Sequence, residues 1–131
     1  MIIRLCILLF VVSLVSCDPA RILLVRCPSK PGSSVELYAR KGILGSWPQQ
    51  DSLEKVTLQL PFSAAGKDTS FLYGVGTWTD ERIANFAAHT DSIVLTNSKG
   101  RQVYNSREAI IQYLRKNRTG AAKSLLTIEA E

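Results

Sequence analysis

The chain has 131 residues, of which 46% are apolar and 21% charged, and its formal net charge is +5. This length suits one domain, and this composition argues against a disordered or low-complexity chain. Three cysteines and one histidine exclude a Cys-rich zinc ribbon, a His-rich metal site and a disulfide-dense miniprotein. We therefore expect no metal and no cofactor.

Residues 1–17 have the pattern of an export signal. A short basic start ends at Arg4, and an almost unbroken apolar run follows from Leu5 to Val15. The run is too short to cross a bilayer, which takes about 20 residues, but it has the length of a signal-peptide hydrophobic region. A buried N-terminal strand or helix is the other interpretation, although the run has no polar face to turn toward water. Removal of residues 1–17 takes away one Arg and no acid, so the net charge falls to +4.

Two kinds of cleavage fit the end of this signal. The run Leu14-Val15-Ser16-Cys17 resembles the lipobox of bacterial lipoproteins. That resemblance implies lipidation of Cys17 and a membrane-anchored protein, and an Asp such as Asp18 after the lipidated Cys is associated with retention at the inner membrane. The alternative is ordinary secretory cleavage near Ser16 or Cys17, which would release a soluble chain.

The N-terminal half of the exported chain fits two arrangements. Both contain a buried strand from Arg21 to Cys27 and an alternating strand from Lys55 to Phe62. In the first, residues 32–34 cap a helix that carries Val35, Leu37, Tyr38 and Ala39. In the second, Val35 to Arg40 is a strand, and Ser70 to Val75 is a further strand that pairs with residues 55–62. The first requires a structureless loop of about 16 residues before Trp78, which counts against it.

The segment from 79 to 120 predicts helix, strand, tight hairpin, strand and helix. Thr79 caps a helix that ends near residues 89–90, because acids follow it in the first turn. The strands cover 92–96 and 101–104, and the turn between them ends at Gly100. Asn105 and Glu108 form a capping box for the last helix, and Gly120 is its C-terminal cap.

With the first arrangement the order is βαβαββα, the order of the thioredoxin fold. Residues 91–114 resemble the final hairpin and helix of the DCC thiol–disulfide oxidoreductase family, and they are similar to the same segment of glutathione-transferase N-terminal domains. The resemblance implies a thioredoxin-like fold. The DCC family carries a Cys-x-x-Cys signature after its first strand, whereas here Cys27 is followed by Lys30 at the position of the resolving cysteine. The cis-proline of these families is replaced by Asp91 or Ser92.

Cys27 is the candidate catalytic residue. It ends a predicted strand, and a nearby helix start together with Arg26 and Lys30 would favour its thiolate. The alternative is an inert thiol. His89, the one histidine, is the only possible imidazole base, and a dyad with Cys27 and with Asp91 as the orienting acid is the functional interpretation. No spacing in the sequence supports that dyad, and a capping or surface histidine at a helix end is the favoured interpretation.

Other features have a structural explanation beside a functional one. Asn117-Arg118-Thr119 is a glycosylation sequon, relevant to a eukaryotic source only. Gly74-Val75-Gly76 is too short for a phosphate loop and indicates a bend or bulge. Trp47 and Trp78 suit a binding face or a core. A basic cluster suits either anionic lipid headgroups or the C-terminal end of a helix, and comprises Arg115, Lys116, Arg118 and Lys123.

We expect residues 18–131 to form one small thioredoxin-like α/β domain with a short tail from about residue 121. The alternative fold is an α+β domain with an antiparallel, β-rich N-terminal half. The predicted function is an exported, membrane-anchored binding or accessory module without catalysis. The alternatives are a single-cysteine oxidoreductase acting through Cys27 and a secreted interaction protein on an antiparallel sheet. The expected partners are the membrane, through a lipid on Cys17, and another protein; nucleic acid is not expected.

Overall fold

The computed structural model describes residues 18–26, 29–40, 55–61 and 68–130. The predicted export signal, Cys17, Cys27 and Trp47 lie outside these ranges. The described elements, in chain order, are β1 (Ala20–Val25), β2 (Ser34–Arg40), β3 (Lys55–Pro61), β4 (Thr69–Val75), α2 (Asp80–Ala88), β5 (Thr90–Asn97), β6 (Gly100–Tyr104), α3 (Arg107–Lys116), β7 (Arg118–Thr119), the 3-10 turn η2 (Ala121–Lys123) and β8 (Leu125–Ile128). The fold is therefore a mixture of α and β structure.

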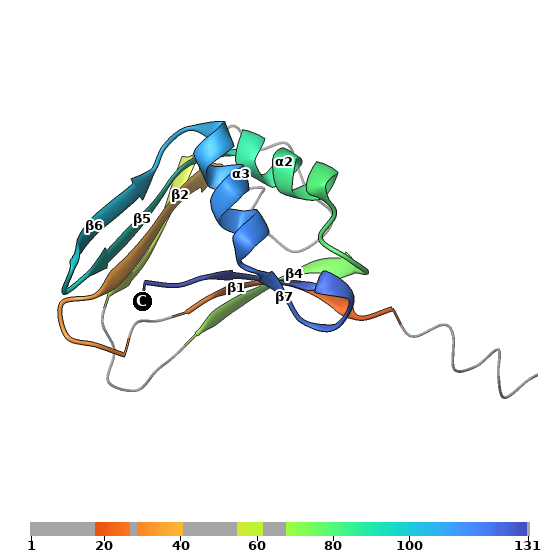
Figure 1. Ribbon diagram of the computed structural model, residues 1–131, viewed down its shortest axis with the longest axis horizontal. Helices are drawn as coiled ribbons and strands as arrows, with labels where there is room; N and C mark the ends of the chain where they lie inside the picture. Colours follow the sequence, from red (N-terminus) through yellow and green to blue (C-terminus); the bar gives the residue numbers. More distant parts are fainter. Residues whose placement is uncertain (1–17, 27–28, 41–54, 62–67, 131) are drawn as a thin grey trace, which may run out of the picture.

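The strands form two four-stranded sheets. Sheet A has the order β4-β1-β8-β7, and sheet B has the order β3-β2-β5-β6. All described neighbours are antiparallel except β1 and β8, which run parallel. In Figure 1 the two sheets form a wedge, and α2 and α3 lie across its open side.

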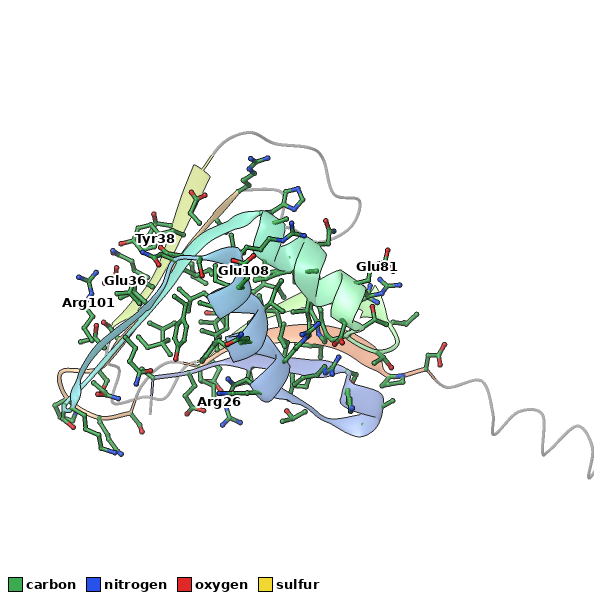
Figure 2. All side chains as sticks on the ribbon, turned by 45° about the horizontal axis from the view of Figure 1, so that its top comes forward. Arg26, Glu36, Tyr38, Glu81, Arg101 and Glu108 are labelled. Carbon is green, nitrogen blue, oxygen red and sulfur yellow. The ribbon has the colours of Figure 1, made fainter. Side chains whose placement is uncertain are left out.

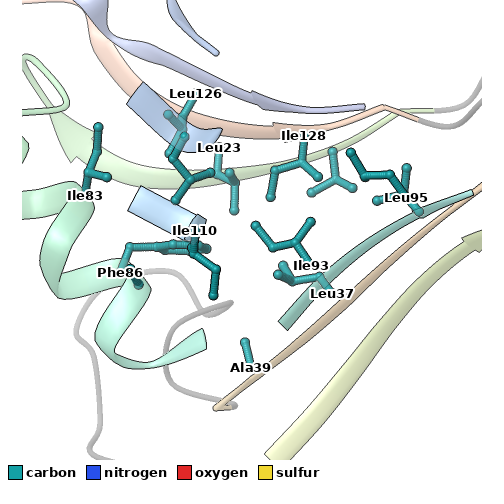
Figure 3. Packing of buried hydrophobic residues seen from close by; sticks show 14 of the residues in the cluster. Leu23, Leu37, Ala39, Ile83, Phe86, Ile93, Leu95, Ile110, Leu126 and Ile128 are labelled. Carbon is teal, nitrogen blue, oxygen red and sulfur yellow. The ribbon is translucent and has the colours of Figure 1, made fainter. Parts of the chain in front are cut away.

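The core fills the space between the two sheets and the two helices. It combines Leu23 and Leu126 of sheet A, Leu37 and Ile93 of sheet B, and side chains from α2 and α3, all less than one-tenth exposed (Figure 3). The helices contribute Ile83, Phe86, Ala87, Ile110 and Leu114. Both sheets keep an outer face, although Val94 of β5, which lies between the core residues Ile93 and Leu95 and so points to the outer side of sheet B, is buried as well.

The helix expected after residues 32–34 is wrong, because β2 is a strand. Its buried side chains, Val35, Leu37 and Ala39, are spaced two apart, which is the period of a strand. The preceding residues form a turn in which the Ser33 N–H donates to the Lys30 carbonyl at 3.2 Å, and Gly32 has φ +77°. Pro31 followed by Gly32 is the signature of a type II turn, which reverses the chain into a strand.

The strand expected at 70–75 exists as β4, but its partner differs from the expectation. β4 pairs with β1, where Phe71 lies opposite Leu23, and β3 pairs with β2. The tail expected from residue 121 is also wrong. β8 lies inside sheet A between β1 and β7, and both Leu126 and Ile128 are fully buried.

The predictions for residues 79–116 are confirmed in order and type, but the expected C-terminal cap at Gly120 is wrong, because Asn117 is the C-cap of α3 and a short strand, β7, follows it. Thr79 caps α2 by accepting from the Arg82 N–H at 3.3 Å. β5 and β6 form the expected hairpin, with Asn97 opposite Gly100. The cap of α3 is one residue later than expected, because the Ser106 hydroxyl accepts from the Ala109 N–H at 3.2 Å.

Candidate functional site

The three residues of the conceivable Cys27–His89–Asp91 arrangement are not brought together by any described contact. Cys27 lies outside the described residues, so its reactivity stays a prediction. His89 follows α2 as its C-cap, and its Nδ1 lies 2.9 Å from the Asn85 carbonyl oxygen. Its backbone carbonyl accepts from the Arg40 N–H, which ties the end of α2 to β2. These bonds give His89 a capping role.

The basic cluster predicted near the C-terminus is divided between two roles. Arg115 and Arg118 both pair with Asp80 at the start of α2, at 3.3 and 3.0 Å. Arg118 also donates to the Trp78 carbonyl at 2.8 Å, so Arg115 joins α3, and Arg118 joins β7, to the start of α2. Lys116 lies apart from them and lines the groove described below.

Asn117, the sequon residue, is the C-cap of α3. Its Nδ2 donates to the Tyr113 carbonyl at 2.8 Å, and its own carbonyl accepts from the Thr127 N–H at 3.1 Å. The residue therefore connects α3 to β8, and its glycosylation stays a prediction.

Trp78 belongs to the core rather than to a binding face. It is 2% exposed, and its Nε1 donates to the Ile22 carbonyl at 3.0 Å. The buried Arg21 guanidinium lies 5.7 Å from the Trp78 ring and donates to the Val75 and Tyr73 carbonyls. Burial and the nearby Arg82 lower the pKa of Arg21. This cluster holds the end of β4 against β1.

The predicted bend at Gly74-Val75-Gly76 is present. Gly74 and Gly76 both have positive φ, and the pairing of β4 with β1 shifts register opposite Ala20 to Ile22. A Cβ at position 74 would lie 3.3 Å from the Arg21 guanidinium. The bend therefore lets β4 pass over Arg21.

The outer side of sheet A is an apolar face. In the middle of the sheet, Leu72, Ile22 and Leu125 lie side by side on β4, β1 and β8. Leu72 is 55% exposed, and Val75, opposite Ala20, is 64% exposed. We call this surface the apolar face and define it by Ile22, Leu24, Leu72, Val75 and Leu125.

The far end of the same sheet carries charges that are matched. Arg26, directly after β1, pairs with Glu129 at 3.3 Å and with Asp68 at 3.9 Å. Sheet A is therefore apolar where the chain enters it near residue 18 and ion-paired where β1 ends. The outer side of sheet B is different in character: it presents Glu36, Tyr38 and Arg101 (Figure 2), and the Tyr38 hydroxyl donates to Glu36 at 2.6 Å. The Glu36 carboxylate, which accepts this bond, raises the pKa of Tyr38.

A groove of about 470 Å³ lies between the β5–β6 hairpin, the C-terminal half of α3 and the residue after β8. Its lining combines core, aromatic and basic residues: Leu95, Asn97, Lys99, Gly100, Arg101, Gln102, Tyr104, Tyr113, Lys116, Asn117 and Glu129. Among the described residues of this lining Glu129 is the one acid, and its carboxylate already accepts from Arg26. The groove therefore has an excess of positive charge.

Two stacked tyrosines form one wall of the groove. The rings of Tyr104 and Tyr113 lie 4.6 Å apart at 33°. The Tyr104 hydroxyl donates to Gln102 at 3.1 Å, and the Tyr113 hydroxyl accepts from the Glu129 N–H at 3.2 Å. These bonds fix both rings, so this wall is pre-formed.

Sequence reasoning missed both surfaces. The run Ile22-Leu23-Leu24-Val25 predicts a strand buried on both faces, yet only Leu23 and Val25 are buried. The groove unites residues 95–104, α3 and Glu129, which are distant in the sequence. Of the groove lining, Lys116 belongs to the basic cluster and Asn117 to the sequon, and neither feature indicates a groove.

Comparisons with protein-family models, with curated proteins and with solved structures found no match. Within the described ranges no three His, Cys, Asp or Glu side chains gather as a metal site would require. None of the helices in the described part of the chain has the length and apolar character needed to span a membrane.

Proposed function

We propose that this protein is an exported accessory module held at a membrane surface, with the apolar face of sheet A turned toward the lipid. The observation that carries the proposal is the position of that face. The predicted export signal and its candidate lipidation residue, Cys17, come three residues before β1, and the apolar end of sheet A is the end that the chain enters first. Three residues span about 10 Å at most, so a lipid on Cys17 would hold this face close to the bilayer.

The face suits a lipid surface for two physical reasons. The backbone groups of its two inner strands, β1 and β8, are paired within the sheet, so contact with lipid would leave few polar groups without partners. The outward side chains Ile22, Leu72, Val75 and Leu125 carry no charge. Full burial of a Leu or Val contributes about 1.5–3 kcal/mol, so the half-exposed Leu72 and Val75 would each add about 1 kcal/mol.

A binding free energy of this size holds a protein at a membrane only together with an anchor. A single lipid chain gives marginal, reversible binding, and stable attachment takes a second signal. The apolar face supplies that second signal in the proposal, and sheet B with the groove is then left facing away from the lipid. Secretion as a soluble interaction protein remains the alternative, in which the same face would bind another protein.

The thioredoxin-like part of the proposal is confined to one segment. The order α2-β5-β6-α3 is what a thioredoxin-like C-terminal half contains, and it supports the predicted resemblance for residues 79–116. The strand β2 and the separate sheet A favour the α+β alternative for the rest of the chain. We therefore propose a binding role for the domain rather than a thiol–disulfide exchange reaction.

Mass spectrometry of the exported protein tests the anchor. The expected result is a diacylglycerol group on an N-terminal Cys17. A free N-terminus at Asp18 would overturn membrane anchoring and favour the secreted alternative.

Cysteine labelling tests the orientation of the face. We would introduce Leu72→Cys and, as a matched control, Val103→Cys, because Val103 is also an exposed aliphatic residue (48%) but lies on sheet B. With the full chain on vesicles, a water-soluble maleimide should label position 72 at least about tenfold more slowly than in detergent, and position 103 at the same rate in both. The unsubstituted chain gives the background from its own cysteines. Equal labelling of both positions on vesicles would contradict the proposed orientation.

A further inference from the structure

We propose that β6 and the adjoining groove form a binding site for an extended, acidic segment of a partner protein, which would add to sheet B as a further strand. The proposal is independent of membrane anchoring, because it concerns the opposite sheet.

The first observation is that β6 is the edge strand of sheet B. Its only strand partner in the described part of the chain is β5, on one side, and in Figure 1 β6 forms the outer margin of the sheet. All of its residues except the last, Tyr104, are exposed. An edge strand of this kind presents a row of backbone groups to which another strand can pair.

The register shows which backbone groups face outward. Asn97 and Gly100 flank the two-residue turn and pair with each other, as a hydrogen-bonded pair does in a tight hairpin. Hydrogen-bonded and non-hydrogen-bonded pairs alternate along an antiparallel ladder. Gln102 and Tyr104 therefore bond to β5, whereas the N–H and C=O groups of Arg101 and Val103 point toward the open edge.

The second observation is that the groove runs along this edge. Gly100, Arg101, Gln102 and Tyr104 of β6 all line it, and the facing wall comes from α3 and Glu129. An added strand would lie about 4.8 Å from β6, and every second side chain would point to the groove side of the sheet. The site thus offers backbone pairing for affinity and a groove for side-chain selection, as in other cases of strand addition.

The third observation is the charge. Lys99 and Lys116 line the groove and are exposed, and none of the ion pairs within the described ranges uses them. Arg101 adds a third cation on the same edge strand, but its side chain lies on the outer side of the sheet near Tyr38. The groove acid, Glu129, is already paired with Arg26. Acidic side chains on the groove side of the bound segment would complement Lys99 and Lys116 and would be drawn to them over several ångströms.

The same charges select against a second copy of this chain. Two β6 edges in antiparallel pairing would bring the Arg101 and Lys99 side chains of both copies close together, and like charges across strands are destabilising. Cationic residues on an edge strand are a known means of preventing such self-pairing. The occupant that fits is therefore a different, acidic segment.

The test titrates the full chain, in a mild non-ionic detergent, with a capped heptapeptide of alternating Glu and Thr. The matched control peptide has Lys in place of each Glu. Amide hydrogen exchange followed by NMR should show slower exchange at Arg101 and Val103 with the Glu peptide, at least about tenfold at saturation. The Lys peptide should leave both amides unchanged.

Two variants isolate the two parts of the site. Val103→Pro removes an outward N–H while the bonds of Gln102 and Tyr104 to β5 remain, and it should weaken Glu-peptide binding at least about tenfold. Val103→Thr keeps the N–H and should bind like the original chain. Lys116→Glu lies on α3 outside the sheet, so it tests the charge even if the proline variant does not fold, and it should weaken binding severalfold.

Several outcomes would overturn the proposal. These are unchanged exchange at Arg101 and Val103 at saturating Glu peptide, equal binding of the Glu and Lys peptides, and undiminished Glu-peptide binding in a folded Val103→Pro or Lys116→Glu variant. Inorganic phosphate is titrated in parallel. If the Glu peptide shifts only the groove resonances that phosphate shifts, the groove is a simple anion site and strand addition is refuted.

Discussion

The burial of β8 predicts that Ile128→Ala destabilises the protein strongly. Ile128 is fully buried, and its strand lies between β1 and β7, with Val25 opposite it in the parallel pairing. The substitution removes three carbon atoms from the core. At about 0.8 kcal/mol for each buried methylene, the lost transfer energy is about 2–3 kcal/mol. The cavity left behind raises the loss to about 3–4 kcal/mol.

Urea denaturation of the full chain at pH 7 measures this loss. A domain of this size has an m-value of about 1–2 kcal/mol per molar urea, so the midpoint should fall by about 2 M or more with m unchanged. Thr127→Ala is the matched control, because Thr127 is the neighbouring half-buried residue on the outer side of sheet A. It should lower the free energy of unfolding by less than about 1 kcal/mol.

Equal midpoints for Ile128→Ala and Thr127→Ala would mean that residues 125–128 are a tail, as the sequence suggested, and that sheet A ends at β1. The measurement therefore separates the two descriptions of the C-terminus directly.

Three further predictions concern single side chains. Arg21→Met should lower the free energy of unfolding by about 1–3 kcal/mol in urea denaturation, because it leaves the partly buried Val75 and Tyr73 carbonyls without their donor. An unchanged midpoint would contradict the role given to this side chain. Tyr73→Phe should be neutral or stabilising at pH 7, because the buried Tyr73 hydroxyl has no hydrogen-bond partner among the described residues. Burial raises the pKa of Tyr73 above its unfolded value of about 10. The free energy of unfolding therefore falls as the pH rises above about 10, because the unfolded phenol loses its proton more readily than the buried one. Between pH 9 and pH 11 the urea midpoint should fall less in Tyr73→Phe than in the original chain, and equal falls would argue against this explanation. Alkylation of Cys27 against pH should follow an ordinary thiol with a pKa of about 8.5, and a thiolate reacting well below that pH would favour the single-cysteine enzyme instead.

Local signals in the sequence predicted the C-terminal half well. The cap at Thr79, the turn at residues 97–100 and the apolar spacing of α3 depend on neighbours within a few residues, and the structure contains each of them. The same kind of signal was ambiguous at residues 34–40. Val35, Leu37 and Ala39 have the period of a strand, but Tyr38 beside them also completes a helical stripe. A sheet partner on each side, β3 and β5, stabilises the strand.

The candidate site was predictable only in its parts. The basic character of residue 116 and the polar hairpin turn were visible in the sequence, whereas the proximity of Tyr104 to Tyr113 and of both to Glu129 was not. Side chains from three separate segments make the groove, and no spacing rule connects them. The apolar face was hidden for a similar reason, because an apolar run does not show which of its two sides is covered.

The sequence by itself thus determined the export signal as a prediction, the helix and hairpin of residues 79–116, and the apolar strands that build the core. Only the tertiary structure decided that β4 pairs with β1, that β8 is an inner strand, and that sheet A keeps an apolar face while sheet B keeps an open basic edge. The physical reason is the range of the interactions. Caps and turns are formed by residues close in the chain, but a strand acquires its partner, its buried side and its place in a sheet from segments up to about a hundred residues away, as β1 and β8 are.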